Sequence, residues 1–179
     1  MRAYRDVILR EVTGALAKID ERASEAFARQ LARARRIYIT GVGRSGLVVK
    51  AFGQRLMHMG FDVHLADEIT APGIARGDIL VACSGTGETE LTMYMARKAR
   101  KIGARCVALT ARGRSPLARL AHLAIVIPAA LERGEGSRQP ARSLFEQALF
   151  LYLDSIVLTM MHELGISQAK MKRRHSNLE

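Results

Sequence analysis

Apolar residues follow two different spacings along the chain, one typical of amphipathic helices and one typical of buried strands. Between about residues 4 and 33 they recur mostly at every third or fourth position among charged residues, which predicts one or two helices with a break near residues 20–24. The helical spacing returns in three later segments, 47–59, 89–102 and 143–163. Each of these is closely followed by a glycine, a common helix stop: Gly60, Gly103 and Gly165.

Short β-prone runs lie between these helices. Five of them are expected to form strands, at residues 37–40, 62–65, 79–83, 105–109 and 123–127, with a short helical turn over 116–121. The run 79–83 has no polar alternation, as in a strand that is buried on both faces of a parallel sheet. Because strands and helices alternate, the sequence predicts an α/β fold, a three-layer α-β-α sandwich with a parallel sheet of about five strands.

Length and composition fit one domain with a substantial core, since the chain has 179 residues and 49% of them are hydrophobic. We expect residues 1–179 to form a single domain, with an N-terminal helical segment (about 4–33), a polar loop at 132–142 and a polar C-terminal tail (about 167–179). We recognise no apolar stretch of membrane-spanning length and no basic-then-apolar leader, so we expect a soluble cytoplasmic protein. Cys83 and Cys106 fall in predicted strands and are interpreted as reduced core residues, with a disulfide or a metal site as the minor alternative.

The formal net charge of +11 raises nucleic acid as a partner. The arginines, however, are scattered along the sequence, and only Lys170–Arg174 forms a compact basic cluster. Aromatic residues make up 5% of the chain and tryptophan is absent, so the composition gives little sign of a base-stacking platform. We therefore expect a solvated basic surface that attracts small anions and keep nucleic-acid binding as a minority alternative.

A loop of small and hydroxylated residues, Ser84–Glu90 (SGTGETE), follows the predicted strand 79–83 and precedes a helix. Its hydroxyl groups and glycines, with the partial positive charge of the helix N-terminus, suit an oxyanion such as phosphate. An ordinary helix N-cap, with Glu88 or Glu90 in the first turn, explains the local chemistry equally well. The residues expected to bind substrate here are Ser84, Gly85, Thr86, Gly87, Glu88 and Thr89.

A second glycine-rich segment, Gly41–Gly46 (GVGRSG), matches the pattern GxGxxG between a predicted strand and a predicted helix. Asp67 or Glu68 lies about twenty residues further on, where a dinucleotide-binding fold places its ribose-binding acid, so a nicotinamide-dependent enzyme is a serious rival interpretation. The second, hydroxyl-rich loop favours a sugar phosphate instead, because the two loops lie at the same edge of one sheet. The residues expected to bind substrate in the first loop are Gly43, Arg44 and Ser45.

The chain resembles the sugar isomerase (SIS) domain family, and within it the group of 6-phospho-3-hexuloisomerases. The resemblance covers nearly all of the chain from about Ile37 onward. SGTGETE belongs to SIS domains in general, whereas the combination of FEQ with a terminal His-x-Asn-Leu-Glu is narrower. The segments that carry the resemblance are GVGRSG (41–46), RLMHMGFDVHLADE (55–68), SGTGETE (84–90), SPLARLA (115–121), SLFEQALFLYLD (143–154) and RRHSNLE (173–179).

The resemblance implies a flavodoxin-like SIS fold and the interconversion of D-arabino-3-hexulose 6-phosphate and fructose 6-phosphate through an enediol, in formaldehyde fixation or pentose supply by the ribulose monophosphate route. A base must take a proton from C2 and return one to C3, which a partly desolvated carboxylate can do near neutral pH. By resemblance this catalytic base is Glu146, and His175 is the second catalytic residue, shuttling a proton or stabilising the enediolate. On the sequence alone, Glu146 is a first-turn glutamate and His175 a solvated tail residue.

The resemblance also implies that no metal or organic cofactor is needed. It implies a homotetramer, with sites completed by neighbouring subunits, and a functional link to 3-hexulose-6-phosphate synthase. Two alternatives stay open at this point. One is a noncatalytic SIS module that senses a sugar phosphate, and the other is a dehydrogenase that uses GVGRSG as its cofactor loop.

Overall fold

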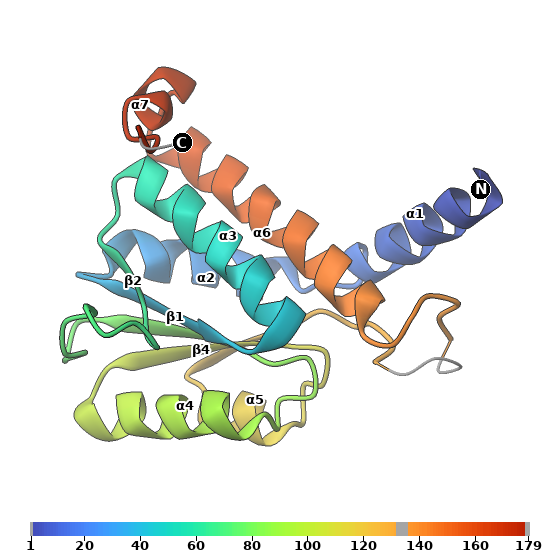
Figure 1. Cartoon of the computed structure of the whole chain (residues 1–179), viewed down its shortest axis with the longest axis horizontal. Helices are drawn as coiled ribbons and strands as arrows, with labels where there is room; N and C mark the ends of the chain where they lie inside the picture. Colours follow the sequence, from blue (N-terminus) through green and yellow to red (C-terminus); the bar gives the residue numbers. More distant parts are fainter. Residues whose placement is uncertain (1, 132–135, 178–179) are drawn as a thin grey trace.

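The computed structural model describes residues 2–131 and 136–177, which form layers of helices around one parallel sheet (Figure 1). The sheet has five strands in the order β2-β1-β3-β4-β5, and all neighbouring pairs are parallel. The strands are β1 (Ile37–Gly41), β2 (Val63–Leu65), β3 (Ile79–Cys83), β4 (Arg105–Thr110) and β5 (Leu123–Val126). The predicted α/β fold with a parallel sheet is therefore confirmed.

The strand order brings the ends of β1 and β3 together. The chain winds outward from β1 to β2 and then crosses back to β3, so the direction of winding reverses between β1 and β3. Gly41 at the end of β1 pairs in register with Cys83 at the end of β3. The loops that follow these two strands consequently start side by side at the carboxyl edge of the sheet, where open α/β sheets bind their ligands.

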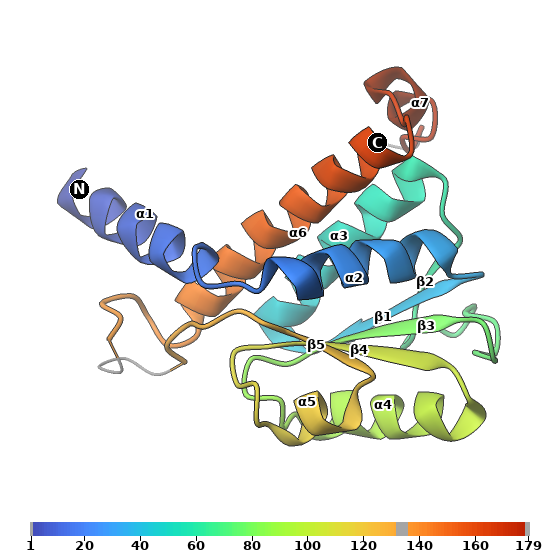
Figure 2. The same ribbon diagram turned by 180° about the vertical axis from the view of Figure 1, so that it is seen from behind.

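Helices cover both faces of the sheet (Figures 1 and 2). The first face carries α2 (Glu21–Arg33), α3 (Gly43–Met59) and α6 (Ser143–Glu163), and the opposite face carries α4 (Glu90–Ile102) and α5 (Pro116–Leu120). α1 (Arg2–Leu16) packs on α6 and extends beyond it, and α7 (Gln168–Lys172) packs on α3. Each face has its own apolar core, with Phe27, Leu56 and Phe145 in the larger one and Ala96 and Leu117 in the smaller one.

The helices begin and end close to the positions that the apolar spacing predicts, except at the start of α3 and for α7, which was not predicted. The N-terminal segment is broken as predicted, but at residues 17–20 rather than near 20–24. Asp20 caps α2 by accepting a hydrogen bond from the backbone N–H of Ala23 at 3.1 Å. α3 begins at Gly43 rather than at Leu47. The first helical bond is already made here, since the backbone N–H of Gly46 donates to the carbonyl of Val42 at 3.2 Å. Position 46 requires glycine, because a Cβ there would lie 2.5 Å from the carbonyl oxygen of Gly41. Arg44 and Ser45 therefore belong to the first turn of a helix and not to a loop.

α6 is the one described helix that is long and apolar enough to cross a membrane, so the expectation that the chain has no apolar stretch of that length is wrong. In this fold 56% of its apolar window is buried, and it packs against α1, α2 and α3. That burial is typical of a core helix in a folded domain. The polar tail forms the short α7, which has no buried residue. Residues 132–135 of the predicted polar loop and residues 178–179 of the tail lie outside the described residues.

Candidate active site

The loop after β3 is organised around the buried hydroxyl group of Ser84. The Oγ of Ser84 accepts a hydrogen bond from the backbone N–H of Gly87 at 3.0 Å and lies 2.8 Å from Thr89 Oγ1. Thr86 Oγ1 accepts a bond from the backbone N–H of Glu88 at 3.2 Å. Thr89 occupies the N-cap position of α4 but makes no capping side-chain bond. The first amides of α4 are thus not capped by this residue, which leaves them available for an anion.

Glycines allow this loop to lie tightly against its neighbours. Gly87 has a φ of +69°, and a Cβ there would lie 2.1 Å from Ser115 Oγ at the start of α5. A Cβ on Gly85 would lie 3.1 Å from Leu131 and 3.2 Å from Phe145 in α6. The shape of the loop is therefore fixed from behind by α5 and α6, and a side chain at either glycine would displace it.

Arg44 and Glu146 join the loop after β1 to the start of α6. The Nε of Arg44 donates a hydrogen bond to Oε2 of Glu146 and forms an ion pair with it. The Arg44 side chain is 66% exposed, whereas the Glu146 side chain is only 6% exposed. A carboxylate buried to this extent needs a partner of opposite charge, and Arg44 provides one. Because Arg44 is largely exposed, it has room to turn toward a bound anion.

Glu146 is also close to the end of β3. Its neighbour Phe145 packs on Gly85, as described above. Burial first, and the negative charge of Glu146 second, raise the pKa of the Cys83 thiol well above its usual value. Cys83 is a free, buried cysteine, in agreement with its interpretation as a reduced core residue, and so is Cys106. The two glycine-rich segments and the first turn of α6 thus meet at one place on the carboxyl edge of the sheet.

His175 lies at the other end of the molecule. Its ring stacks on the ring of His58, in the last turn of α3, with 4.9 Å between the ring centroids and an interplanar angle of 24°. α3 begins at the candidate site, and at about 1.5 Å per residue Arg44 and His58 are about 21 Å apart along its axis. Within one chain, the structure therefore brings together all the predicted site residues except His175.

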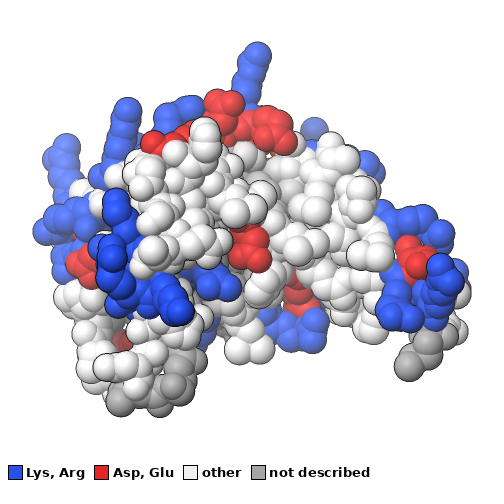
Figure 3. Space-filling model, turned by 90° about the horizontal axis from the view of Figure 1, so that it is seen from above, with Lys and Arg blue, Asp and Glu red and all other residues white. Residues whose placement is uncertain are grey.

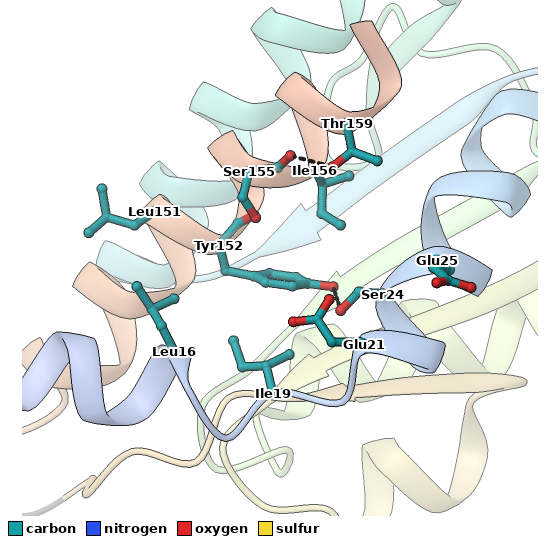
Figure 4. A pocket seen from close by; sticks show the side chains of 10 residues that line it. All are labelled: Leu16, Ile19, Glu21, Ser24, Glu25, Leu151, Tyr152, Ser155, Ile156 and Thr159. Atoms are coloured by element: carbon teal, nitrogen blue, oxygen red, sulfur yellow. Dashed lines mark hydrogen bonds between the residues drawn. The ribbon is translucent and has the colours of Figure 1, made fainter. Parts of the chain in front are cut away.

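A separate cavity of about 270 Å³ lies between α6 and the turn that joins α1 to α2 (Figure 4). Its hydroxyl groups already have partners, since Tyr152 donates to Ser24 Oγ at 3.1 Å and Ser24 donates to the carbonyl of Asp20 at 2.9 Å. Burial raises the pKa of Tyr152 to about 12, so this hydroxyl stays protonated. None of the residues that line this cavity belongs to the two glycine-rich segments. Within residues 2–131 and 136–177, no three His, Cys, Asp or Glu side chains are grouped so as to hold a metal ion.

Three residues that shape the loop after β3 were not predicted from the sequence: Ser115, Leu131 and Phe145. Ser115 precedes Pro116, and this Ser-Pro pair is a recognisable helix start, confirmed by the bond that Ser115 Oγ accepts from the N–H of Ala118. Its contact with Gly87 joins segments that are distant in the sequence, so no local sequence pattern predicts this contact. Leu131 and Phe145 likewise meet Gly85 only through the fold.

Comparison with known proteins gives a consistent result. Residues 30–153 match the family model described as the SIS domain. The chain is 40% identical to a 3-hexulose-6-phosphate isomerase from Mycobacterium gastri, over 94% of this chain and 86% of that protein. It is 37% identical to a protein of the same name from Bacillus subtilis, over 98% of this chain and 97% of that protein.

A solved structure of a hypothetical protein from Methanococcus jannaschii shares the fold, with a TM-score of 0.88, 27% identity and 99% of each chain covered. Its published description infers a function of 3-hexulose-6-phosphate isomerase for that protein. The family match spans the sheet and the first turns of α3, α4 and α6, which hold the candidate site. Sequence, fold and site geometry lead to one conclusion: this chain belongs to the SIS domain family.

Proposed function

We propose that the protein interconverts D-arabino-3-hexulose 6-phosphate and fructose 6-phosphate, as the names of its relatives from Mycobacterium gastri and Bacillus subtilis indicate for those proteins. The observation that carries the proposal is the buried carboxylate of Glu146, which lies beside a loop suited to phosphate and is paired with one largely exposed arginine, Arg44. A base beside a phosphate-binding loop is what an isomerase of phosphorylated sugars requires. The alternatives of a noncatalytic sensing module and of a nicotinamide-dependent dehydrogenase are not favoured by these relatives.

The substrate phosphate binds at the loop after β3. The hydroxyls of Ser84, Thr86 and Thr89 and the first amides of α4 supply donors, and the helix N-terminus supplies partial positive charge. Gly87 keeps this turn open because it adopts a positive φ that other residues rarely adopt. Gly43, Arg44 and Ser45, in the first turn of α3, bind the sugar from the adjacent strand end. Glu88 orients the loop through its backbone bond to Thr86.

Glu146 acts as the base. In the forward direction it takes the proton from C2 of the 3-ketose, the C2–C3 bond becomes the double bond of an enediolate, and the same carboxyl group returns a proton to C3. The carbonyl thereby moves from C3 to C2, and one proton passes from the oxygen on C2 to the oxygen on C3. Arg44 leaves the carboxylate as the anionic substrate enters and then faces the enediolate oxygens, where its charge stabilises the intermediate.

His175 supplies the transfer between the two oxygens in the site of a neighbouring copy. What supports this is its position about 21 Å along α3 from its own site, together with the exposed apolar surface of the helical layer. Leu47 of α3 and Leu158 of α6 are 69% and 64% exposed, and Phe150 and Leu151 are also exposed. Figure 3 shows this face as a broad area with few charged groups between basic groups at its two ends. A second copy turned end for end on this face brings its tail toward Glu146.

The wider setting of the proposal follows from the same reaction. The chain acts as a single SIS domain and a homotetramer in the cytoplasm, where phosphorylated sugars are available. It contributes to the ribulose monophosphate route in formaldehyde fixation or pentose supply, and it is functionally linked to 3-hexulose-6-phosphate synthase. The exposed leucines on α3 and α6 support self-association, since an apolar surface of this kind is uncommon on a monomer.

A coupled assay tests the proposal. Hexulose 6-phosphate made enzymatically is converted, and the fructose 6-phosphate formed is followed by NADPH absorbance, for the wild type, Glu146→Gln and the control Glu163→Gln. Glu163 is an exposed acid at the far end of the same helix. We expect Glu146→Gln to lower kcat about 10²–10⁴-fold and Glu163→Gln to leave it unchanged. An inactive wild type contradicts the function, whereas an active Glu146→Gln contradicts only the assignment of the base. Thermal stabilisation by NAD without stabilisation by fructose 6-phosphate favours the dehydrogenase instead.

A further inference from the structure

One contiguous segment of the chain is strongly basic, and most of its basic residues lie on one layer of the molecule. Residues 90–122, which include α4, β4 and α5, hold eight of the 28 basic residues and one of the 17 acidic residues. This segment therefore carries +7 of the formal net charge of +11. All eight basic residues are exposed: Arg97, Lys98, Arg100, Lys101, Arg105, Arg112, Arg114 and Arg119.

These charges are not neutralised within the described part of the chain. The six ion pairs found among the described residues all lie elsewhere and include none of the eight. Arg100 and Arg119 donate to the backbone carbonyls of Leu120 and Arg114, and Arg105 donates to Gln30 Oε1 at 3.1 Å, all of them uncharged acceptors. The positive charges also affect a neighbouring group: the pKa of His122 is lowered, first by burial and then by the charges of Arg100 and Arg105.

An apolar groove of about 260 Å³ opens at the edge of this layer, between α4 and the loop that follows β2. Among the described residues that line it, Lys98 is basic and Glu68 is acidic, and most of the others are apolar: Ala66, Ala71, Pro72, Ile74, Leu80, Met95 and Ala99. The wall is firm on the strand side, because the hydroxyl of Tyr38 donates to the carbonyl of Pro72 at 2.9 Å. The groove is of a size to take one or two apolar side chains rather than a whole second domain.

The exposed face of α4 continues the groove as a stripe. Leu91, Tyr94 and Ile102 are each about half exposed, at spacings of three and eight residues along one side of the helix. The ammonium of Lys98 lies 5.6 Å from the ring centroid of Tyr94, within cation–π range. Arg97 and Lys101 flank the stripe. Exposed apolar and aromatic side chains framed by arginine and lysine are typical of surfaces that bind protein segments of opposite charge.

We propose that this α4 surface, defined by the groove and by Leu91, Tyr94, Lys98 and Ile102, docks an acidic segment of another protein, with an apolar side chain of that segment in the groove. Charge complementarity selects an acidic partner. Without Arg105, which faces Gln30 of α2, the layer has seven basic residues against Glu90, and Glu68 is the acidic residue that lines the groove. The apolar groove favours a protein segment over a duplex nucleic acid, whose bases are stacked inside and whose outer surface is charged phosphate and sugar. The surface lies on the opposite side of the sheet from α3 and α6, so self-association through those helices leaves it open (Figures 1 and 2).

The test uses synthetic probes and the full chain. The first probe is a peptide of about 20 residues, rich in Glu and Asp, with one Phe and two Leu at helical spacing. The second is the same peptide with Ser in place of Phe and Leu. The variants are Lys98→Glu, which reverses a charge at the groove, and Ala71→Phe, which fills the groove. Lys18→Glu is the matched control, because Lys18 is exposed outside this layer and the change in net charge is the same. Thermal melting and circular dichroism verify that each variant is folded.

We expect the first peptide to bind the wild type with a Kd at least about tenfold lower than that of the serine peptide. Lys98→Glu and Ala71→Phe are expected to raise this Kd at least about tenfold, and Lys18→Glu less than about twofold. Equal binding of both peptides, or an unchanged Kd in folded Ala71→Phe, overturns the proposal. Two other probes are a 20-nucleotide DNA oligomer and a phosphatidylglycerol vesicle. If either binds more tightly than the first peptide, and Ala71→Phe does not change its binding, the proposal is overturned and the layer is assigned to nucleic acid or membrane. Failure of both peptides to bind also overturns the proposal. This outcome does not depend on whether the isomerase activity is found.

Discussion

Gly87 is the position in the phosphate loop where a single added methyl group is expected to have the largest effect. In Gly87→Ala the new Cβ would lie 2.1 Å from Ser115 Oγ and 2.4 Å from Ser115 Cβ, at a residue with a φ of +69°. The positive φ alone costs about 1–2 kcal/mol for a residue other than glycine. Overpacking adds about 1–3 kcal/mol, so the free energy of unfolding is expected to fall by about 2–5 kcal/mol.

A second substitution separates these two contributions. Ser115→Gly removes the two nearest atoms that the new Cβ would meet and leaves Thr110 Oγ1 at 3.2 Å. As an N-cap replacement it costs only about a few tenths of a kcal/mol. The double variant Gly87→Ala/Ser115→Gly is then expected to lose only about 1–2 kcal/mol, which gives a favourable coupling energy of about 1–3 kcal/mol in the double-mutant cycle.

Urea unfolding of the four proteins measures the free energies, and the same proteins are assayed for KM with fructose 6-phosphate. KM is expected to rise in Gly87→Ala and to recover in part in the double variant, because the loop regains its turn. A Gly87→Ala protein with unchanged stability and unchanged KM would refute the packing described for this loop. A double variant as unstable as Gly87→Ala would show that Ser115 is not the obstacle.

Two further predictions concern catalysis and stability. If His175 acts in a neighbouring copy, co-refolding inactive Glu146→Gln with inactive His175→Asn is expected to restore about one quarter of wild-type activity, because hybrid sites then contain both native residues; no recovery in the mixture contradicts action across subunits. Burial opposes ionisation of Asp78, but hydrogen bonds from Arg35, the Ala75 backbone N–H and Arg36 outweigh it and lower the pKa of this carboxyl. Asp78→Asn is therefore expected to destabilise the protein by about 3 kcal/mol at pH 7. The difference in unfolding free energy between wild type and Asp78→Asn is expected to shrink as the pH falls below the ordinary carboxyl pKa of 3.8 toward the lowered value. Chemical unfolding at pH 3 and pH 7 measures it. A difference that does not depend on pH contradicts the ionised state of Asp78.

The elements of this fold were predictable where burial alone determines the pattern. The run Ile79–Cys83 is buried at every position in the middle of the sheet, so it has no polar residue and is recognisable as a strand. The start of α3 was not predictable, because Gly43 and Gly46 have low helix propensity, yet the backbone N–H of Gly46 donates to the carbonyl of Val42 and Gly46 packs against Gly41. Strand order likewise depends on contacts between distant segments and leaves no local signature.

The candidate site also has one part that the sequence predicts and one part that only the fold brings together. The loop Ser84–Glu90 combines glycines and hydroxyls within a few residues, so its chemistry is visible in the sequence. Glu146 looks like any first-turn glutamate until the fold pairs it with Arg44, which is 102 positions earlier in the chain. The resemblance to SIS domains singled out Glu146, and the periodicity of apolar residues did not.

The distribution of charge shows why composition alone gave an incomplete picture of the surface. Seven of the basic residues between Arg97 and Arg119 lie in α4, in α5 or in the loop before α5, on one side of the sheet (Figure 2). Arg105 is the exception, because it begins β4 and donates to Gln30 of α2 on the other side. The opposite side, formed by α3 and α6, exposes leucines instead. In the proposed assembly through the apolar side, the cationic side of every copy faces outward, so a partner with an acidic segment would have several equivalent docking positions. Linked binding at several such positions raises the apparent affinity of a multivalent acidic partner without any new contact within each site.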